Sequence, residues 1–479
     1  MWTSINQALN IIDNFVWGVP LMVLIIAGGL LLTIRLGLLQ IRKLPLALKW
    51  MLQNEEGGKG EISSFSALCT ALSATIGTGN IVGVATAVCA GGPGALFWMV
   101  VAAFLGMATK YSEGLLAVKY RTVAEDGHSL GGPFYYIELG MGRNFKWLAK
   151  IFAFFGVCVG LFGIGTFSQV NGISSAVHGF FDPNDAFTVK ILPFLGEYSW
   201  SVVIASLILS FCVAAVLIGG VKRIASVSQI IVPFMAVIYF VFAVILICCN
   251  ITKVPAAFAT IVTSAFSPKA ITGGAVGSML IAMQKGVARG IFSNEAGLGS
   301  APIAAAAAQT NSPVRQGLVS MTGTFIDTII ICTLTGLSIV LTGAWQVEGL
   351  EGVQVTTYAF QHGLPFPAQF SSFILMLCLV FFAFTTILGW DYYSERCLEY
   401  LSGGNMKHVK IFRWIYILAV FIGPYMTVSA VWTIADIFNG LMAIPNMIAL
   451  FALSGVIVKE TRAFFQHAKE EALAEHRSF

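Results

Sequence analysis

The stretch SATIGTGNIVG, from Ser73 to Gly83, interrupts an otherwise apolar run with three glycines, two threonines and an asparagine. Each glycine in a helix interior costs about 1 kcal/mol relative to alanine, so a continuous helix is disfavoured here. Within a membrane, a broken helix leaves backbone N–H and C=O groups that only protein or a bound ligand can satisfy. We therefore predict a discontinuous helix at this point, whose free backbone groups form a binding site.

The composition indicates that this run lies in a membrane. The chain has 479 residues, of which 57% are hydrophobic and 10% are charged, and its mean hydropathy is +0.83. A soluble protein carries about 25% charged residues. A β-barrel needs alternating strands of about ten residues, whereas these apolar runs are continuous and about twice as long. We predict an all-α polytopic membrane protein in contact with lipid and without a nucleic-acid partner.

Eleven apolar runs are long enough to cross about 30 Å of hydrocarbon. As one helix, the run 274–309 would be about 54 Å long at 1.5 Å per residue, so it must bend, break or extend beyond the membrane. The first run lacks the flanks of a signal peptide and is expected to be retained. The runs are 16–37, 64–91, 94–118, 147–179, 199–218, 225–249, 274–309, 316–342, 368–400, 410–428 and 430–458.

The distribution of lysine and arginine predicts the orientation. Basic residues concentrate in alternate connectors and in the C-terminal tail, whereas the opposite connectors hold only Lys190, Lys253 and Lys269. By the positive-inside rule, the N-terminus lies outside and the C-terminus lies in the cytoplasm.

The ten runs after the first fall into two halves of nearly equal length. Each half holds five spans, an odd number, so the second half enters the membrane from the opposite side, as in an inverted repeat. A second glycine-rich stretch, AITGGAVGSM (Ala270–Met279), opens the second half, and a break there would need an outer half-helix from 255–269. The predicted units are an N-terminal helix and connector (1–63), the first repeat (64–249), an outer connector that begins the second broken helix (250–273), the second repeat (274–459) and a cytoplasmic tail (460–479).

Paired breaks at matching positions point to a transport site at the membrane midplane. Half-helix N-termini suit a carboxylate, and unwound carbonyls with hydroxyl and amide oxygens suit a hard cation such as Na⁺. The alternative is that these glycines serve only close helix packing.

Four motifs resemble the alanine or glycine:cation symporter family. The resemblance implies a leucine-transporter-type fold of the amino acid–polyamine–organocation superfamily, with a five-plus-five inverted repeat after one extra helix. It also implies a prokaryotic cytoplasmic-membrane protein that moves alanine or glycine with Na⁺, or sometimes H⁺. The motifs are SATIGTGNIVGVATAV (73–88), GGPGALFWMVVAAFLGMATKYSEGLLAVKYR (91–121), GGPFYYIELG (131–140) and GVARGIFSNEAGLGSAPIAAAA (286–307).

The same resemblance implies substrate and sodium ligands. The unwound turn would receive the substrate carboxylate, and the break in the seventh span would take the amino group. One sodium site would use a carbonyl and an asparagine of the first broken helix. A second would use two of its carbonyls and a hydroxyl pair from the ninth span, although threonine often bonds to its own helix. The substrate residues are Thr75, Gly77, Thr78, Gly79, Gly273, Gly274 and Ala275, and the Na⁺ ligands are Thr75 and Asn80, then Ser73, Ile76, Thr385 and Thr386.

Two further side chains are candidates for contact with the substrate. The Gln169 amide could reach the substrate or could bridge two helices. Trp390 could cap the pocket and limit the substrate side chain, or could belong to an aromatic belt at the membrane interface. We list both as substrate-binding candidates.

Charged residues inside the runs are functional by default. Asp327 could be a cation ligand, a proton site or the partner of Lys110, Lys285 or Arg289 in an ion pair. Lys110 and Glu113 are spaced for an i,i+3 pair that needs no function. The segment from Arg289 to Glu295 could form an inner gate or a fixed packing network.

We conclude that the sequence encodes a secondary active symporter that couples uptake of alanine or glycine to Na⁺ by alternating access, with H⁺ coupling through Asp327 as the alternative. A channel is not expected, because it would need a ring of carbonyl or charged groups from repeated subunits, whereas the chain holds one long two-fold pseudo-repeat. An enzyme is not expected, because no nucleophile–base set, metal motif or P-loop is visible. No organic cofactor is expected. The oligomeric state, the preference between alanine and glycine, and the ion stoichiometry do not follow from the sequence.

Overall fold

The computed structural model describes the chain except for residues 1, 54, 56, 125–126, 191–196, 267–274, 426–427 and 478–479. The described part is helical apart from two small antiparallel hairpins, β1 (Thr122–Val123) with β2 (Ser129–Leu130) and β3 (Thr188–Lys190) with β4 (Glu197–Ser199).

Most of the helices coincide with the predicted apolar runs, whereas α1, α3, α4, α8, α13 and α18 lie before or between these runs. The α-helices are α1 (Trp2–Val16), α2 (Val19–Arg35), α3 (Leu39–Arg42), α4 (Leu44–Met51), α5 (Ser64–Thr75), α6 (Val84–Gly91), α7 (Gly94–Lys119), α8 (Pro133–Tyr135), α9 (Lys146–Phe162), α10 (Phe167–Phe181), α11 (Trp200–Leu217), α12 (Gly220–Cys249), α13 (Val254–Phe266), α14 (Ala275–Asn294), α15 (Ala301–Ala305), α16 (Pro313–Thr324), α17 (Thr333–Thr342), α18 (Val353–Gly363), α19 (Ala368–Leu401), α20 (Met406–Ile422) and α21 (Val428–Arg477). The π-helical segments are η1 (Gly79–Gly83), η2 (Tyr136–Met141) and η5 (Phe325–Cys332), and the 3₁₀ turns are η3 (Arg143–Phe145), η4 (Ile251–Lys253), η6 (Ala344–Gln346) and η7 (Gly423–Tyr425).

Eight helical segments of the described chain are long and apolar enough to cross a membrane, and the bent pair of α5 with η1 and α6 makes a ninth. The two other expected spans are α14 with α15, which carries Lys285 and Arg289, and α20, which has 17 residues. The count of eleven and the inverted repeat therefore stay predictions. The eight are Gln7–Arg35, Gly94–Lys119, Arg143–Phe181, Trp200–Leu217, Gly220–Cys249, Pro313–Thr342, Ala368–Leu401 and Trp432–Glu470.

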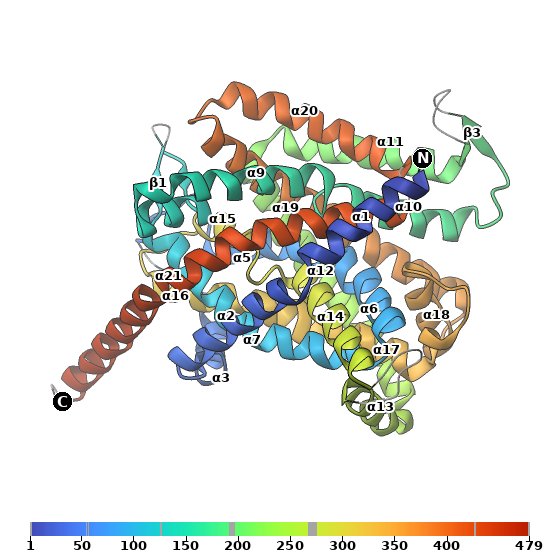
Figure 1. The fold of residues 1–479 in the computed structure, drawn as a ribbon, viewed down its shortest axis with the longest axis horizontal. Coiled ribbons are helices and arrows are strands. Elements are labelled where there is room, and N and C mark those ends of the chain that lie inside the picture. The colour runs from blue at the N-terminus through green and yellow to red at the C-terminus, as the bar shows by residue number, and fades with distance from the viewer. Residues whose placement is uncertain are drawn as a thin grey trace.

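The long helix α21 crosses the molecule diagonally, with α1 and α2 beside it (Figure 1). On one side of α21 lies α9, which packs against α21 and α19, and beyond it lies α20. On the other side α7 packs against α14 and α16, and α14 packs against α6. The broken helices are thus enclosed by other helices.

The first predicted break is confirmed. The Ser63 hydroxyl caps α5 by accepting the N–H of Ser66, and α5 ends at Thr75, where Ile76 turns to an extended conformation. The chain resumes as a helix from Gly79 at an angle of 51° to α5.

A second break follows α14 and lies inside the run 274–309, which was too long for one straight span. Glu295, Gly297 and Gly299 all have positive φ, and the short helix α15 begins at Ala301. Glycine adopts positive φ freely, whereas for a glutamate it is uncommon. The long run is therefore two helices joined by a turn.

The buried Glu113 carboxylate of α7 holds this second turn. Its Oε1 accepts the N–H groups of Gly297 (3.1 Å) and Gly299 (3.2 Å) and the side-chain amide of Asn446 (2.7 Å). The Lys110 ammonium, one turn earlier, donates to the Asn294 carbonyl at 2.8 Å. The expected i,i+3 ion pair between Lys110 and Glu113 does not form. Lys110 binds the end of α14 instead, and Glu113 binds the turn that follows it.

Gly77 of the first break admits no side chain. A Cβ there would lie 2.5 Å from Thr386 Oγ1 and 2.8 Å from Gln169 Oε1. We expect Gly77→Ala to destabilise the protein by about 1–3 kcal/mol through overpacking. Thermal unfolding of the purified protein measures this. Gly83→Ala is the matched control, because its Cβ would meet no atom closer than 3.9 Å, and equal melting temperatures for the two variants would contradict the prediction.

Replacing Glu113 separates its hydrogen bonds from its charge. Glu113→Gln retains an oxygen at Oε1, and Oε2 has no hydrogen-bond partner in the described chain, so this variant should unfold near the wild-type temperature. Glu113→Ala leaves two buried N–H groups unpaired and should cost about 3 kcal/mol or more. Unfolding in SDS titrations of both variants tests this, and an equally strong loss in the Gln variant would show that the charge, not the oxygen, holds the turn.

Candidate functional site

The first break meets the last turn of α14 in the interior. Gly91 lies against Ala282, and Gly79 lies against Ser293, where an added Cβ would come within 3.2 Å of the Ser293 Cα. The contacts therefore pair increasing residue numbers in η1 and α6 with decreasing residue numbers in α14, so the two helices run antiparallel. This packing sets the first break beside the end of α14.

Two side-chain amides satisfy N–H groups of the first break. Asn80 Oδ1 accepts the N–H of Gly77 at 2.8 Å, and Gln169 Oε1 of α10 accepts the N–H of Thr78 at 3.0 Å. Both amides are buried, as is the Thr78 hydroxyl, which has no hydrogen-bond partner in the described chain. Gln169 thus lies at the break itself, where its carbonyl occupies a position suited to a ligand oxygen.

The Asp327 carboxylate joins the first break to the end of α14. It is fully buried on η5, and its Oδ1 accepts the Asn80 amide at 2.7 Å. Its Oδ2 accepts the hydroxyls of Ser293 (2.8 Å) and Thr328 (2.7 Å). Three segments that are distant in sequence therefore converge on one carboxylate.

Asp327 forms no ion pair with a lysine or arginine of the described residues. The Lys110 ammonium binds the Asn294 carbonyl, and the Arg289 guanidinium binds both carboxylate oxygens of Asp436, at 2.9 and 2.6 Å. The ion-pair interpretation of Asp327 is therefore wrong. Burying a carboxylate without a direct ion pair is costly, and here the three hydrogen bonds from Asn80, Ser293 and Thr328 offset part of that cost.

The two adjacent threonines of α19 face different neighbours. Thr386 Oγ1 lies 3.2 Å from the Ile76 carbonyl, next to the break, and 3.0 Å from the Phe382 carbonyl of its own helix. Thr385 Oγ1 also bonds to its own helix, but its other neighbour is the Met235 sulfur of α12, at 3.7 Å. The structure brings Thr386, but not the Thr385 hydroxyl, to the first break.

The hydroxyls of Ser73 and Thr75 are occupied within α5. Ser73 Oγ donates to the Thr70 carbonyl at 2.7 Å, and Thr75 Oγ1 donates to two carbonyls of the preceding turn. Any role of these two residues at the break is therefore a role of their backbone carbonyls.

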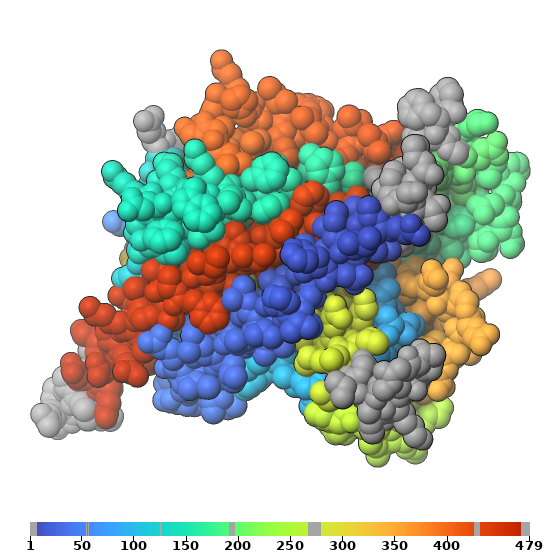
Figure 2. All heavy atoms as spheres, viewed as in Figure 1, coloured from blue at the N-terminus to red at the C-terminus, as the bar shows by residue number. Residues whose placement is uncertain are grey.

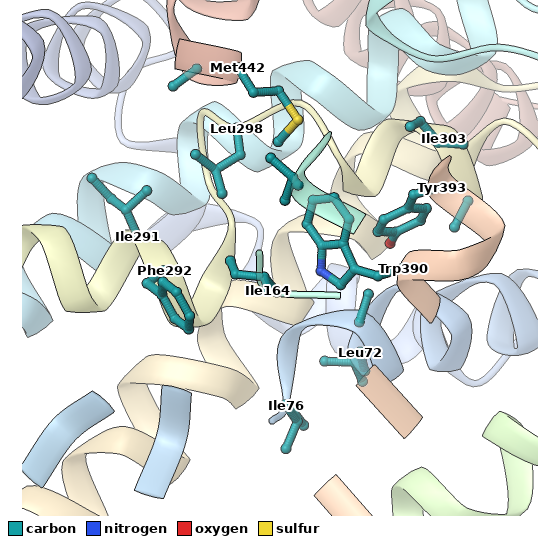
Figure 3. Close-up of a cluster of buried hydrophobic side chains, with 14 of the residues drawn as sticks. Leu72, Ile76, Ile164, Ile291, Phe292, Leu298, Ile303, Trp390, Tyr393 and Met442 are labelled. Atoms are coloured by element: carbon teal, nitrogen blue, oxygen red, sulfur yellow. The ribbon is translucent and has the colours of Figure 1, made fainter. Parts of the chain in front are cut away.

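Trp390 is enclosed by protein and does not face outward. It is fully buried on α19, beside Tyr393 and in the same cluster as Ile164 and Leu298 (Figure 3). Its indole N–H donates to Glu295 Oε1 at 2.7 Å. The aromatic-belt interpretation is wrong, and Trp390 connects α19 to the strained residue of the second break.

The residues assigned to the amino-group site lie elsewhere or outside the described part. Gly273 and Gly274 are outside the described residues. Ala275 begins α14, and at 1.5 Å per residue it is about 27 Å from Ser293 along that helix. Among the described residues, Phe292 and Ser293 at the end of α14 meet the first break, and the turn Glu295–Ser300 follows directly after that helix. Its G-x-G spacing, Gly297 and Gly299, repeats that of Gly77 and Gly79 and was the sequence signal that we missed.

Arg289 lies beside α6 rather than toward α5. A Cβ at Gly83 would lie 3.9 Å from its side chain, and the guanidinium stands over the rings of Phe292 and Trp432. With the α5 end toward the cytoplasm, as the basic connectors predict, Arg289 would belong to the outer side; because that orientation stays a prediction, the assignment of Arg289 to an inner gate is untested.

The chain has close relatives along its whole length. It is 55% identical over 467 residues to an uncharacterized transporter of Haemophilus influenzae, with 97% of each chain covered. It is 47% identical over 471 residues to the sodium/alanine symporter AgcS of Methanococcus maripaludis, covering 97% of this chain and 98% of that protein.

A solved structure and a family match agree with these relatives. The crystal structure of MhsT in complex with L-phenylalanine, a transporter of the leucine-transporter fold, matches with a TM-score of 0.56 at 12% identity, over 85% of this chain and 93% of that chain, so the fold is shared. Residues 2–478 match the family described as the sodium:alanine symporter family. This chain therefore belongs to the sodium:alanine symporter family.

Proposed function

We propose that this protein is a symporter that couples uptake of alanine or glycine to Na⁺ by alternating access around the two breaks. The observation that carries the proposal is the buried Asp327 carboxylate, which is bound by residues of both broken helices and pairs with no lysine or arginine of the described chain. A cation that binds there would hold the two helices together.

We propose two positions for Na⁺. One uses the Asp327 carboxylate with Asn80 and the Thr75 carbonyl. The other uses the carbonyls of Ser73 and Ile76 with the Thr386 hydroxyl, which already lies 3.2 Å from the Ile76 carbonyl. Unwound carbonyls and side-chain oxygens coordinate Na⁺ in transporters with broken helices.

The substrate carboxylate would take the N–H groups of the turn Gly77–Gly79. Gln169 Oε1 now accepts one of them, from Thr78, so the substrate would displace a neutral amide. The amino group would take carbonyls of Glu295–Ser300, and a contribution from Gly273 and Gly274 stays a prediction. Trp390, held by Glu295, would limit the substrate side chain to a small group.

Alternating access requires a closure on each side of the site. On the α6 side, Arg289 pairs with Asp436 of α21. On the α5 side, Arg121 donates to the carbonyls of Ala306 (3.1 Å), Ala308 (2.8 Å) and Thr310 (2.9 Å), and Ile62 forms a bridge with Ala308. We infer that these two sets of contacts open in alternation, with the α5 side and the C-terminus toward the cytoplasm of a prokaryotic cell.

Adjacent threonines give a matched test of the second Na⁺ position. Thr386→Val removes the hydroxyl beside the Ile76 carbonyl and should raise the Na⁺ concentration for half-maximal alanine uptake about tenfold or more, since losing a ligand to a charged group costs about 1.5–3 kcal/mol. Thr385→Val is the control and should stay within about twofold of the wild type, because its hydroxyl faces Met235. Labelled-alanine uptake into proteoliposomes measures both variants, and equal behaviour would exclude this ligand assignment.

Asp327→Asn distinguishes sodium from proton coupling. With an inward Na⁺ gradient against an equal K⁺ gradient at fixed pH, we expect wild-type uptake only with Na⁺ and a loss of at least tenfold in the variant. Uptake that is unchanged in K⁺ but driven by an inward proton gradient would instead support the second candidate, an H⁺-coupled symporter in which Asp327 carries the proton. Facilitated equilibration without any ion gradient would contradict both.

A further inference from the structure

A groove of about 460 Å³ separates the end of α2 and the helix α3 from the last turns of α21. In Figures 1 and 2, α2 and α3 lie along α21, which continues beyond them toward the C-terminus. Thr461 and Gln466 are among its lining residues. The groove is remote from the two breaks and plays no part in the proposed transport site.

Five basic side chains line the groove and none of its lining residues is acidic. Within the described chain, none of the five forms an ion pair with a carboxylate, since Arg35 donates to the Ser454 hydroxyl (2.5 Å) and Arg42 donates to the Gly37 carbonyl (3.1 Å). Among the side chains that the structure describes, the lining of the groove is therefore strongly positive. The five are Arg35, Arg42, Lys43, Arg462 and Lys469.

The backbone is built to bring two of these cations into the groove. The turn after α2 places both Gly37 and Leu38 at positive φ, a conformation that is uncommon for leucine. This reversal folds the Arg42 guanidinium back over the end of α2. Lys43 Nζ lies 4.2 Å from the centre of the Phe465 ring, so it is oriented against α21.

Apolar side chains also line the groove, among them Ile34, Leu39 and Phe465. The two candidate spans beside it end here, at Arg35 and, along α21, near Glu470. Ile34 is 68% exposed, and Ile41 of the adjoining helix α3 is 57% exposed, which is costly in water and favourable against acyl chains. The groove therefore presents cations and exposed apolar side chains together at the level where spans leave the membrane.

We propose that this groove binds an anionic phospholipid, with its phosphate between Arg42 and Arg462 and an acyl chain along Ile34 and Phe465. Basic pockets between membrane helices at the cytoplasmic side bind anionic headgroups. The site joins the extra N-terminal helix to the C-terminal helix, so a bound lipid also fastens the two ends of the chain together.

The test measures lipid binding directly, so its outcome does not depend on the transport function. Purified full-length protein in an uncharged detergent is titrated with dioctanoyl phosphatidylglycerol, dioctanoyl phosphatidylcholine or inorganic phosphate, and bound lipid is counted by native mass spectrometry. We expect phosphatidylglycerol to bind at least tenfold more tightly than either other probe. Equal binding of phosphatidylcholine would overturn the charge requirement, and equal binding of inorganic phosphate would assign the groove to a free anion.

Matched variants locate the site. Arg42→Gln with Arg462→Gln should weaken phosphatidylglycerol binding about 25-fold, because each basic residue near an anionic surface contributes about fivefold, equivalent to about 1 kcal/mol. The control, Lys407→Gln with Lys410→Gln, removes two exposed charges at the start of α20, outside the groove, and should change binding less than twofold. Arg42→Lys with Arg462→Lys retains the charges and should bind within about threefold. An equal loss in the control would overturn the proposal.

Discussion

The contact between the Asn80 amide and the buried Asp327 carboxylate is the constraint on which the site depends. It ties the first broken helix to η5, and the same carboxylate receives the Ser293 hydroxyl from α14. Moving any one of these segments therefore breaks a hydrogen bond to a group that has no water to replace it, and such a loss is expensive for a buried charge. The close approach that permits the contact comes from Gly79, which leaves no room for a side chain beside Ser293.

The two breaks differ in the side chains that accept hydrogen bonds from their free backbone N–H groups. At the first break, neutral amides of Asn80 and Gln169 accept the N–H groups. At the second, a carboxylate accepts two N–H groups at once, and Glu295 is fixed by Trp390 and by Ser300 (2.5 Å). Hydrogen bonds to charged groups are about twice as strong as neutral ones. Under the proposed function, a ligand would displace the amides more readily than the carboxylate, so we expect the first break to be the exchangeable part of the site.

The first break could be predicted from the sequence because its cause is local. Three glycines in eleven residues weaken a helix whatever surrounds them. The second break could be located only in outline, as a run too long for one straight helix. We placed the second break at AITGGAVGSM because that stretch opens the second half, whereas the described break follows α14 and uses Gly297 and Gly299 with a strained Glu295. Its stabilising partner, Glu113, is 184 residues from Gly297, and no local pattern indicates such a contact. Likewise Thr385 and Thr386 are indistinguishable in sequence, and only the rotation of α19 separates them.

Coupling follows from the same geometry by a thermodynamic argument. A ligand shifts a conformational equilibrium only by its differential affinity for the two states. Under the proposed function, a cation at Asp327 would take over from the Asn80 and Ser293 hydrogen bonds the task of linking the segments around the carboxylate, and would bind tightly only while those segments are packed together. The substrate would need the same packing, because its two ends would be held by the two breaks. Each ligand would then pre-organise the site for the other, and their binding would be reciprocally linked. One Na⁺ moving down 100 mV supplies about 2.3 kcal/mol, sufficient for roughly fifty-fold accumulation, so a single cation held in this way is enough to drive uptake.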